Sequence, residues 1–418
     1  MTTDNVQISM RRVVVTGMGI WSCIGQDLQT VTESLKQGRS GVIFDPKRVE
    51  YGLHSGLVGN VPRPDLKPLL PRKFRATMSE DAEYAYMAAC QALEKSGITD
   101  EYLRQNEVGL IFGSEGATDC IVQAADIMAQ EKEVTALQPN MLFQSEASSV
   151  SMNLSTIFHI KGINLTISAA CASSSHAIGL ATTLIRDGMQ DSILVGGCCM
   201  LSEVSAPVYD AINGLSRRND SPHKASCPFD EARDGIVHSG GAAALMLEDY
   251  EHAIERGADI FAEIVGIGVC SNGDEISAPT TMKVDVAMQR AIADAGIEAG
   301  DLDYICPMAA SLINEDEYEA IAIDRLFRDK KAYVSSTESM TGHENFMAGA
   351  SKTVYTILMM LNNFIAPNIN LKTPSEAAKN LRIAKQTIQT PIQYAMINAS
   401  GLGGTNCCIV VKNYSKSS

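Results

Sequence analysis

Hydrophobic residues follow two patterns along this chain, and the patterns alternate. Short runs of apolar, often β-branched residues are typical of buried strands, whereas apolar residues that recur every three or four positions indicate helices. The runs predict strands at 13–20, 108–113, 163–167, 262–269 and 302–307, and the spaced positions predict helices at 82–98, at 172–185 and ending near 297. Strands that alternate with helices indicate an α/β protein with parallel sheet covered by helices.

The strand-and-helix pattern occurs twice. Segments 13–20 and 262–269 each contain Gly-x-Gly, and each is followed by a helix that closes on glycine, Gly97 or Gly296, and then by another strand. Glycine is the usual residue for the left-handed conformation after a helix. The first Gly-x-Gly lacks the third glycine and the later acidic residue of a dinucleotide loop, so we do not expect a dinucleotide site.

The repeat predicts two related halves, 1–255 and 256–418. The matching elements are much farther apart in the first half than in the second. We therefore expect a large insertion in the first half, within 45–79 and 114–152.

Composition restricts the function. The net charge of −15 argues against nucleic acid as a partner, because phosphate backbones are bound by Lys and Arg. No apolar run reaches the roughly 18 residues of a membrane span, and residues 1–10 lack the apolar centre of a signal peptide, so we expect a cytoplasmic protein without a membrane span. The eleven cysteines form no C-x-x-C pair and no zinc-type spacing, which predicts free thiols and no metal site.

Cys171 lies between the predicted strand 163–167 and the predicted helix 172–185, in Ser-Ala-Ala-Cys-Ala-Ser-Ser-Ser-His. At a helix N-terminus the unpaired N–H groups and the helix dipole favour the thiolate over the thiol. The small neighbouring residues leave room for a substrate. Cys171 is therefore a candidate nucleophile. The alternative is a buried structural cysteine, because a free thiol packs like a small apolar group.

Five motifs occur in the order found in β-ketoacyl-(acyl carrier protein) synthases, and the chain resembles that family from 12 to 411. The motifs lie at 14–19, 168–173, 228–235, 339–343 and 403–406. The resemblance implies an α/β, thiolase-like fold of duplicated halves in a layered helix-sheet-helix-sheet-helix arrangement. It also implies that Cys171 takes an acyl group from the phosphopantetheine of an acyl carrier protein, without any other cofactor.

The resemblance also implies a second reaction step, but several residues that carry this step in the family are replaced in this chain. In the family, two histidines donate hydrogen bonds to the thioester oxygen while a malonyl group loses carbon dioxide and its enolate attacks the acyl-cysteine. His343 keeps one histidine, but Met308 stands at the other position, and a thioether cannot donate a hydrogen bond. Glu338 replaces a family lysine whose acidic partner survives as Glu319. Two acids at close range would repel unless one is protonated or they point apart.

Further family positions have changed along the pantetheine and acyl tunnel. Ala310 and Leu312 replace two threonines that bind the pantetheine arm, and Ser400 and Leu402 replace two phenylalanines of a gate. Thr405 remains in the Gly-Gly-Thr-Asn motif. Together with Met308 and Glu338, these changes predict a reduced or absent malonyl-elongating activity.

Other residues have two interpretations each. Arg72, Lys73 and Arg75 form a basic cluster in an acidic chain; similar family positions help to dock the acidic carrier protein, and a solvated surface cluster is the alternative. His176 is expected to be packed and turned away from the nucleophile. His238 either lines a tunnel or is a hydrogen-bonded core histidine.

The sequence therefore predicts a subunit of the chain-length-factor type in fatty acid or polyketide biosynthesis, which pairs with a complete ketosynthase and shapes its acyl tunnel. Its retained Cys171 departs from the usual chain-length factors, in which the cysteine is replaced. One alternative is a working ketosynthase or acyltransferase that uses Cys171 and His343 alone; another is a homodimeric acyl-binding protein. The partner, a homologous ketosynthase or a second copy, is expected to pair along 163–167.

Overall fold

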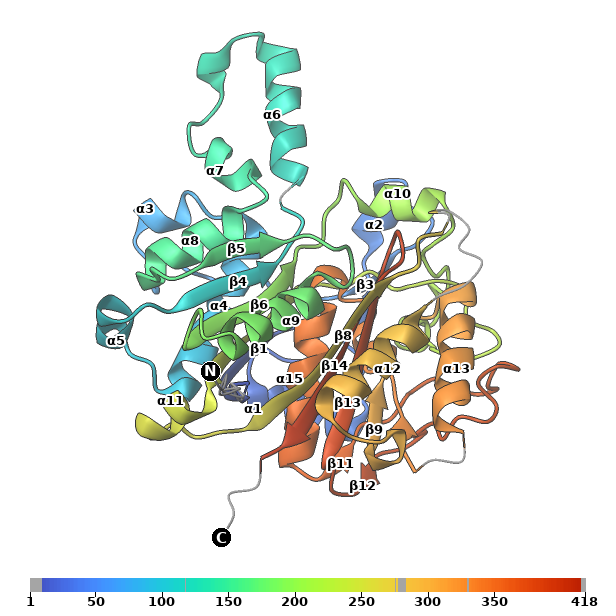
Figure 1. Ribbon diagram of the computed structural model, residues 1–418. Helices are drawn as coiled ribbons and strands as arrows, with labels where there is room; N and C mark the ends of the chain where they lie inside the picture. Colours follow the sequence, from blue (N-terminus) through green and yellow to red (C-terminus); the bar gives the residue numbers. More distant parts are fainter. Residues whose placement is uncertain (1–9, 117, 275, 277–282, 329–330, 415–418) are drawn as a thin grey trace.

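Two sets of five strands join into one ten-stranded sheet (Figure 1). The computed structural model describes residues 10–116, 118–274, 276, 283–328 and 331–414. The first set comprises β1 (Val13–Trp21), β4 (Gly109–Gly113), β5 (Asn164–Ile167), β6 (Ser192–Cys199) and β7 (Gly241–Asp249). The second set comprises β8 (Ala262–Ser271), β9 (Tyr304–Cys306), β10 (Tyr333–Val334), β13 (Tyr394–Gly401) and β14 (Thr405–Asn413).

The two sets have the same internal pairing, with the sheet order β10-β9-β13-β14-β8-β1-β7-β6-β4-β5. In each set two neighbouring pairs are antiparallel, β1–β7–β6 and β8–β14–β13. The other two are parallel, β6–β4–β5 and β13–β9–β10. A short antiparallel contact between β1 and β8 joins the sets. The predicted duplication of an α/β unit is confirmed.

Helices form three layers around the two sets of strands. In the centre, α9 (Ser173–Arg186) and α15 (Ala348–Leu361) contact each other and strands of both sets. Outside them, α4 (Glu80–Ser96) packs on β1, β6 and β7, and α12 (Val284–Ala295) packs on β8, β13 and β14. The layers are therefore helix, sheet, helix, sheet and helix, as the resemblance implied.

The repeated Gly-x-Gly lets the outer helices approach the strands closely. A Cβ atom at Gly19 would lie 2.0 Å from the carbonyl oxygen of Ala88 in α4, and one at Gly268 would lie 1.9 Å from that of Ala287 in α12. Both helices end as predicted, on Gly97 and Gly296 in the left-handed conformation. The motif is thus a packing feature of both halves.

The segments expected to carry the insertion in the first half contain additional elements. The earlier one holds α2 (Pro46–Glu50), β3 (Leu57–Gly59) and α3 (Arg72–Arg75), and the later one holds α6 (Thr118–Glu131), η1 (Val134–Ala136), α7 (Met141–Ser145) and the start of α8 (Ser149–Phe158). Helices α6 and α7 project from the body of the protein (Figure 1).

The remaining elements are short or peripheral. They are α1 (Leu28–Gln37), β2 (Val42–Phe44), α5 (Asp100–Gln105), α10 (Ala206–Ala211), η2 (Pro222–Lys224), α11 (Tyr250–Glu255), η3 (Ala299–Asp301), α13 (Ile313–Phe327), α14 (Glu338–Thr341), η4 (Asn345–Met347), β11 (Phe364–Ile365) and β12 (Ile388–Gln389). Within the described ranges, no helix is long and apolar enough to cross a membrane. All eleven cysteines are described, and all are free.

Candidate active site

Cys171 lies in the sharp turn between β5 and α9, where the sequence placed it. Ala170, directly before it, has φ = 48°, a left-handed conformation that few residues other than glycine adopt. Ser173, the first residue of α9, fixes the turn by accepting a hydrogen bond from the Ala169 N–H at 2.9 Å. The turn holds the Cys171 side chain inside the protein, where the residue is only 6% exposed.

The structure brings the two predicted catalytic residues into contact. The Nε2 atom of His343, just after α14, lies 3.0 Å from the Sγ atom of Cys171. Its Nδ1 atom lies 2.7 Å from the Oε2 atom of Glu338. Thiol, imidazole and carboxylate therefore form a continuous chain of contacts, which is the arrangement of an activated nucleophile with an oriented base.

Glu338 is paired with a lysine on another helix, and Glu319 has other partners, so the repulsion that two acids at close range would cause is avoided. The Nζ atom of Lys352, in α15, lies 2.6 Å from the Oε1 atom of Glu338, and both side chains are 0% exposed. Burial raises the pKa of Glu338, but Lys352 and His343 outweigh it and lower the pKa below the ordinary value. Burial lowers the pKa of Lys352, but the negative charge of Glu338 outweighs burial, so the pKa of Lys352 is raised above its ordinary value. Glu338 is therefore ionised.

Glu319, expected to be the partner at position 338, instead faces the loop after β9. Its carboxylate accepts hydrogen bonds from the backbone N–H groups of Met308 at 2.9 Å and Ala309 at 2.8 Å. The side-chain amide of Asn398 donates a third, at 2.9 Å. Glu319 thus holds the loop that carries Met308.

Glu338 and Cys171 make His343 cationic at neutral pH. Burial lowers the pKa of His343, but the carboxylate of Glu338 and the Cys171 sulfur raise it to about 10. An imidazolium beside a thiol favours the thiolate, the nucleophilic form.

Apolar side chains surround the thiol on the side where the resemblance places substrate. Met308 and Ala310 belong to one buried cluster with Cys171, and Leu312 packs against this cluster. The cluster also contains Leu53, Ala206, Leu215 and Ile236, with Tyr209 packed against it. The immediate surroundings of Cys171 are therefore apolar.

The two expected gate positions near the C-terminal motif differ in exposure and contacts. Ser400 donates a hydrogen bond to the side chain of Asn406 at 2.7 Å, and Leu402 is 60% exposed. Thr405 lies 2.8 Å from the Nε2 atom of His176, which ties α9 to this motif. The expected packed role of His176 agrees with this contact.

His238 is buried in a position next to the site. The backbone around it pairs with that of His343, and its ring centre lies 5.6 Å from that of Tyr209. Among the described residues, no hydrogen-bond partner reaches its Nδ1 atom, and both interpretations of His238, a tunnel residue or a hydrogen-bonded core histidine, stay predictions. Burial, Arg48 and His343 lower its pKa to about 3, which keeps the ring neutral.

Two family models together match most of the chain. The one described as the N-terminal domain of beta-ketoacyl synthase matches residues 10–253, and the one described as its C-terminal domain matches residues 261–372. The chain belongs to the β-ketoacyl synthase family.

Individual relatives agree with this assignment. The 3-oxoacyl-(acyl-carrier-protein) synthase 1 of Haemophilus influenzae is 39% identical over 97% of this chain and 100% of its own length. A beta-ketoacyl synthase from Burkholderia phymatum has a TM-score of 0.92 at 34% identity, covering 97% of this chain and 100% of that one. The ishigamide ketosynthase/chain length factor has a TM-score of 0.88 at 24% identity, over 97% of this chain and 100% of that one, which shows a shared fold.

At this site, Lys352 is the residue that sequence reasoning missed. It is the one charged residue in α15, a helix whose other residues are apolar, small or hydroxyl-bearing. A charge in the middle of a buried helix needs a partner of opposite sign. The sequence therefore indicated that Lys352 has an acidic partner, but it did not indicate which residue that partner is.

The basic cluster on α3 is only partly available to a carrier protein. Arg72 and Lys73 are exposed. Arg75 is half-buried and donates a hydrogen bond to the Leu70 carbonyl at 3.0 Å. Any docking role therefore falls mainly to Arg72 and Lys73.

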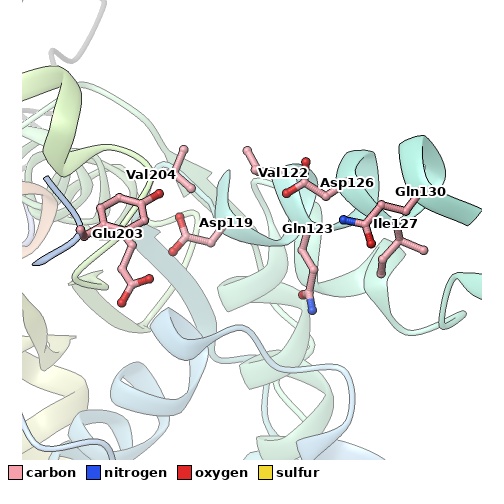
Figure 2. A pocket seen from close by; sticks show the side chains of 9 residues that line it. Asp119, Val122, Gln123, Asp126, Ile127, Gln130, Glu203 and Val204 are labelled. Carbon is pink, nitrogen blue, oxygen red and sulfur yellow. The ribbon is translucent and has the colours of Figure 1, made fainter. Parts of the chain in front are cut away.

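A surface pocket beside α6 is separate from the catalytic residues (Figure 2). Asp119, Asp126 and Glu203 give it an acidic lining, and none of the residues that line it belongs to the site around Cys171. Within the described parts of the chain, no cluster of His, Cys, Asp or Glu could hold a metal ion.

Proposed function

We propose that this β-ketoacyl synthase homologue takes an acyl group onto Cys171 but elongates it poorly, and that it works as a chain-length-factor-like subunit beside a complete ketosynthase. The observation that carries the proposal is the composition of the site. The Cys171–His343 contact is present, while Met308 stands among the apolar side chains around the thiol. The site can hold an acyl thioester but lacks one donor for the oxygen on which negative charge develops.

The proposed partners are an acyl carrier protein and a second condensing subunit. The substrates would arrive on the phosphopantetheine of the carrier protein in fatty acid or polyketide biosynthesis, and no other cofactor is proposed. The exposed Arg72 and Lys73 support docking of an acidic carrier. Among the described residues, β5 pairs only with β4, and its free edge and the projecting α6 and α7 (Figure 1) support a subunit interface. Through this interface the chain would close the far end of the partner's acyl tunnel.

The second candidate is a ketosynthase or acyltransferase that works without a complete partner. The short Cys171–His343 distance and the 39% identity to a 3-oxoacyl-(acyl-carrier-protein) synthase 1 favour it.

Carbon dioxide release separates the two candidates. We expect the isolated chain to decarboxylate malonyl carrier protein on the order of 10²-fold more slowly than a complete ketosynthase, since one charge-stabilising hydrogen bond is missing. The assay is run on the chain alone, on a complete ketosynthase alone and on the co-expressed pair. Release and elongation at a normal rate by the isolated chain would favour the second candidate.

Substitution of Met308 by His tests whether the missing donor is the only defect. We expect Met308→His alone to leave carbon dioxide release within about 10-fold of the parent, less than a single well-placed donor supplies, because Ala310, Leu312 and the reversed charge at Glu338 remain. The conservative Met308→Leu is the matched control for altered packing. A gain near 10²-fold in Met308→His alone would contradict this expectation.

A further inference from the structure

A carboxylate contacts His343 at the point where the family resemblance expects a lysine. Glu338 lies 2.7 Å from Nδ1, and the opposite ring nitrogen, Nε2, lies 3.0 Å from the sulfur of Cys171. Lys352 holds the other carboxylate oxygen at 2.6 Å. The buried ion pair thus has an anion, not a cation, on the side of the imidazole.

The sign of that charge determines which chemistry His343 performs. Decarboxylative condensation uses the histidine as a hydrogen-bond donor, because loss of carbon dioxide itself creates the carbon nucleophile. A base for an O–H nucleophile needs a different setting, in which a carboxylate orients the ring through Nδ1–H and stabilises the imidazolium that forms. The structure provides this second setting.

We propose that Cys171, His343 and Glu338 act as a Cys–His–Glu triad that hydrolyses the acyl thioester formed on Cys171. The proposal rests on the proposed acylation of Cys171 and adds an activity to it. Cys171 and His343 are the catalytic residues, and Glu338 is a positioning residue that acts through His343.

The first half of the reaction moves the acyl group from carrier to enzyme. The Cys171 thiolate attacks the carbonyl carbon of the incoming thioester, and the new carbon–sulfur bond replaces the bond to the pantetheine sulfur. The imidazolium of His343 gives its Nε2 proton to the departing thiolate. The acyl-enzyme then carries a neutral His343, whose Nε2 is no longer held by a thiolate and whose Nδ1–H still points at Glu338.

The second half consumes one water molecule. Nε2 of His343 takes a proton from the water as its oxygen attacks the acyl carbonyl carbon. Collapse of the tetrahedral intermediate breaks the carbon–sulfur bond, releases the carboxylic acid and restores the thiolate–imidazolium pair. The net reaction is thioester plus water to carboxylic acid plus thiol, without any other reactant.

The groups around the triad are consistent with this assignment. Ionisable side chains face it from several elements: Cys171 before α9, Glu338 on α14, Lys352 on α15, Glu344 beside His343 and His238 before β7. His238 is held neutral. Lys352 is neutralised by Glu338, so the carboxylate remains the charge in direct contact with Nδ1.

Hydrolysis is tested with octanoyl-N-acetylcysteamine as the thioester probe and the full chain as the enzyme. Intact-mass spectrometry measures octanoyl-Cys171, and release of octanoate measures turnover. We expect octanoate release that disappears in Cys171→Ala. If the parent forms a stable octanoyl-Cys171, hydrolysis is refuted and the proposed acylation stands. If the parent forms neither acyl-enzyme nor octanoate, both proposals fail.

The double variant Glu338→Lys/Lys352→Glu isolates the sign of the charge, since it keeps a buried ion pair and the net charge. We expect it to form octanoyl-Cys171 and to hydrolyse it about 10²-fold more slowly, because general-base assistance is typically worth at least that factor. The pH at half-maximal hydrolysis should also shift downward, since a cation beside Nδ1 disfavours the imidazolium. Hydrolysis by the double variant at the parent rate and with the parent pH profile would overturn the role of Glu338.

The single variant Glu338→Gln tests the same role if the double variant does not fold. Glu338→Gln keeps the shape of the side chain and an oxygen for Nδ1–H to bond, while it removes the negative charge and leaves the buried Lys352 without its anionic partner. We expect the same accumulation of octanoyl-Cys171 and the same downward shift in pH. Unchanged deacylation in Glu338→Gln would refute the triad.

Discussion

At the scale of single residues, the site depends on charges that are buried in pairs. Glu338 contacts both His343 and Lys352, and all three side chains are buried. Removing one partner of a buried ion pair strands the other charge, which typically costs about 3–5 kcal/mol. The charges of Glu338, His343 and Lys352 are therefore coupled to the stability of the whole protein.

This coupling predicts a loss of stability in alkaline solution. The pKa of His343 is raised from 6.5 to about 10, so its charge stabilises the folded state fully below about pH 6.5, and this stabilisation is lost as the pH rises through about 10. We expect the melting temperature of the parent to fall over this range more than that of His343→Gln, which keeps the Glu338–Lys352 pair. If the melting temperatures of the two proteins fall by the same amount as the pH rises, the stabilising role of the His343 charge is contradicted.

At the scale of elements, the close packing of outer helices on strands depends on the repeated glycines. A Cβ atom at Gly19 would overlap the carbonyl oxygen of Ala88, which belongs to a helix and has little room to move. Gly268 meets the same restriction in the second half. The pattern that resembles a nucleotide loop is therefore explained by helix packing.

A single methyl group tests this packing. We expect Gly19→Ala to reduce the free energy of unfolding by about 3 kcal/mol, the upper range for overpacking. Gly257→Ala serves as the comparison for backbone strain without close packing, because its φ of 72° disfavours a side chain but its Cβ atom would meet nothing within 4 Å, whereas Gly19 has no positive φ; the cost of Gly257→Ala should stay near 1 kcal/mol. Thermal and urea unfolding measure both. A loss at Gly19→Ala no larger than the loss at Gly257→Ala would contradict the packing role of Gly19.

At the scale of the whole molecule, the sheet ends at an open edge. Among the described residues, β5 pairs only with β4, and Asn164 and Leu165 in β5 are exposed. Exposed strand edges attract further strands. Because β5 leads directly to Cys171, a partner at this edge would lie next to Cys171.

Charge at this edge should prevent assembly. We expect the parent to form a dimer, with a complete ketosynthase or with itself, that buries more than roughly 2,000 Å², and Leu165→Asp to remain monomeric. Leu361→Asp is the matched control, because both leucines are 41% exposed and Leu361 ends α15, away from β5. Size-exclusion chromatography and native mass spectrometry of each chain, alone and co-expressed, give the stoichiometry. If the Leu165→Asp chain assembles as the parent does, the edge of β5 is not the subunit interface.

Local patterns in the sequence were sufficient to predict the duplicated strands and helices, the glycine helix ends and the turn that carries Cys171. These features depend on residues that are close together in the chain. The order of the family motifs was sufficient to connect Cys171 with His343. The loss of a donor at Met308 was also visible in the sequence, since a thioether lacks an N–H or O–H in any fold.

Only the tertiary structure decided how the charges pair. The sequence left open whether Glu338 and Glu319 lie close together or point apart, and the folded chain turns Glu319 toward the backbone of Met308 and Ala309 and places Lys352 against Glu338. The two partners lie on different helices, α14 and α15, and nothing in their spacing along the chain specifies that they meet. In a buried site, where charges interact strongly and cannot be solvated, it is this contact in space that sets the protonation of His343 and hence the chemistry open to Cys171.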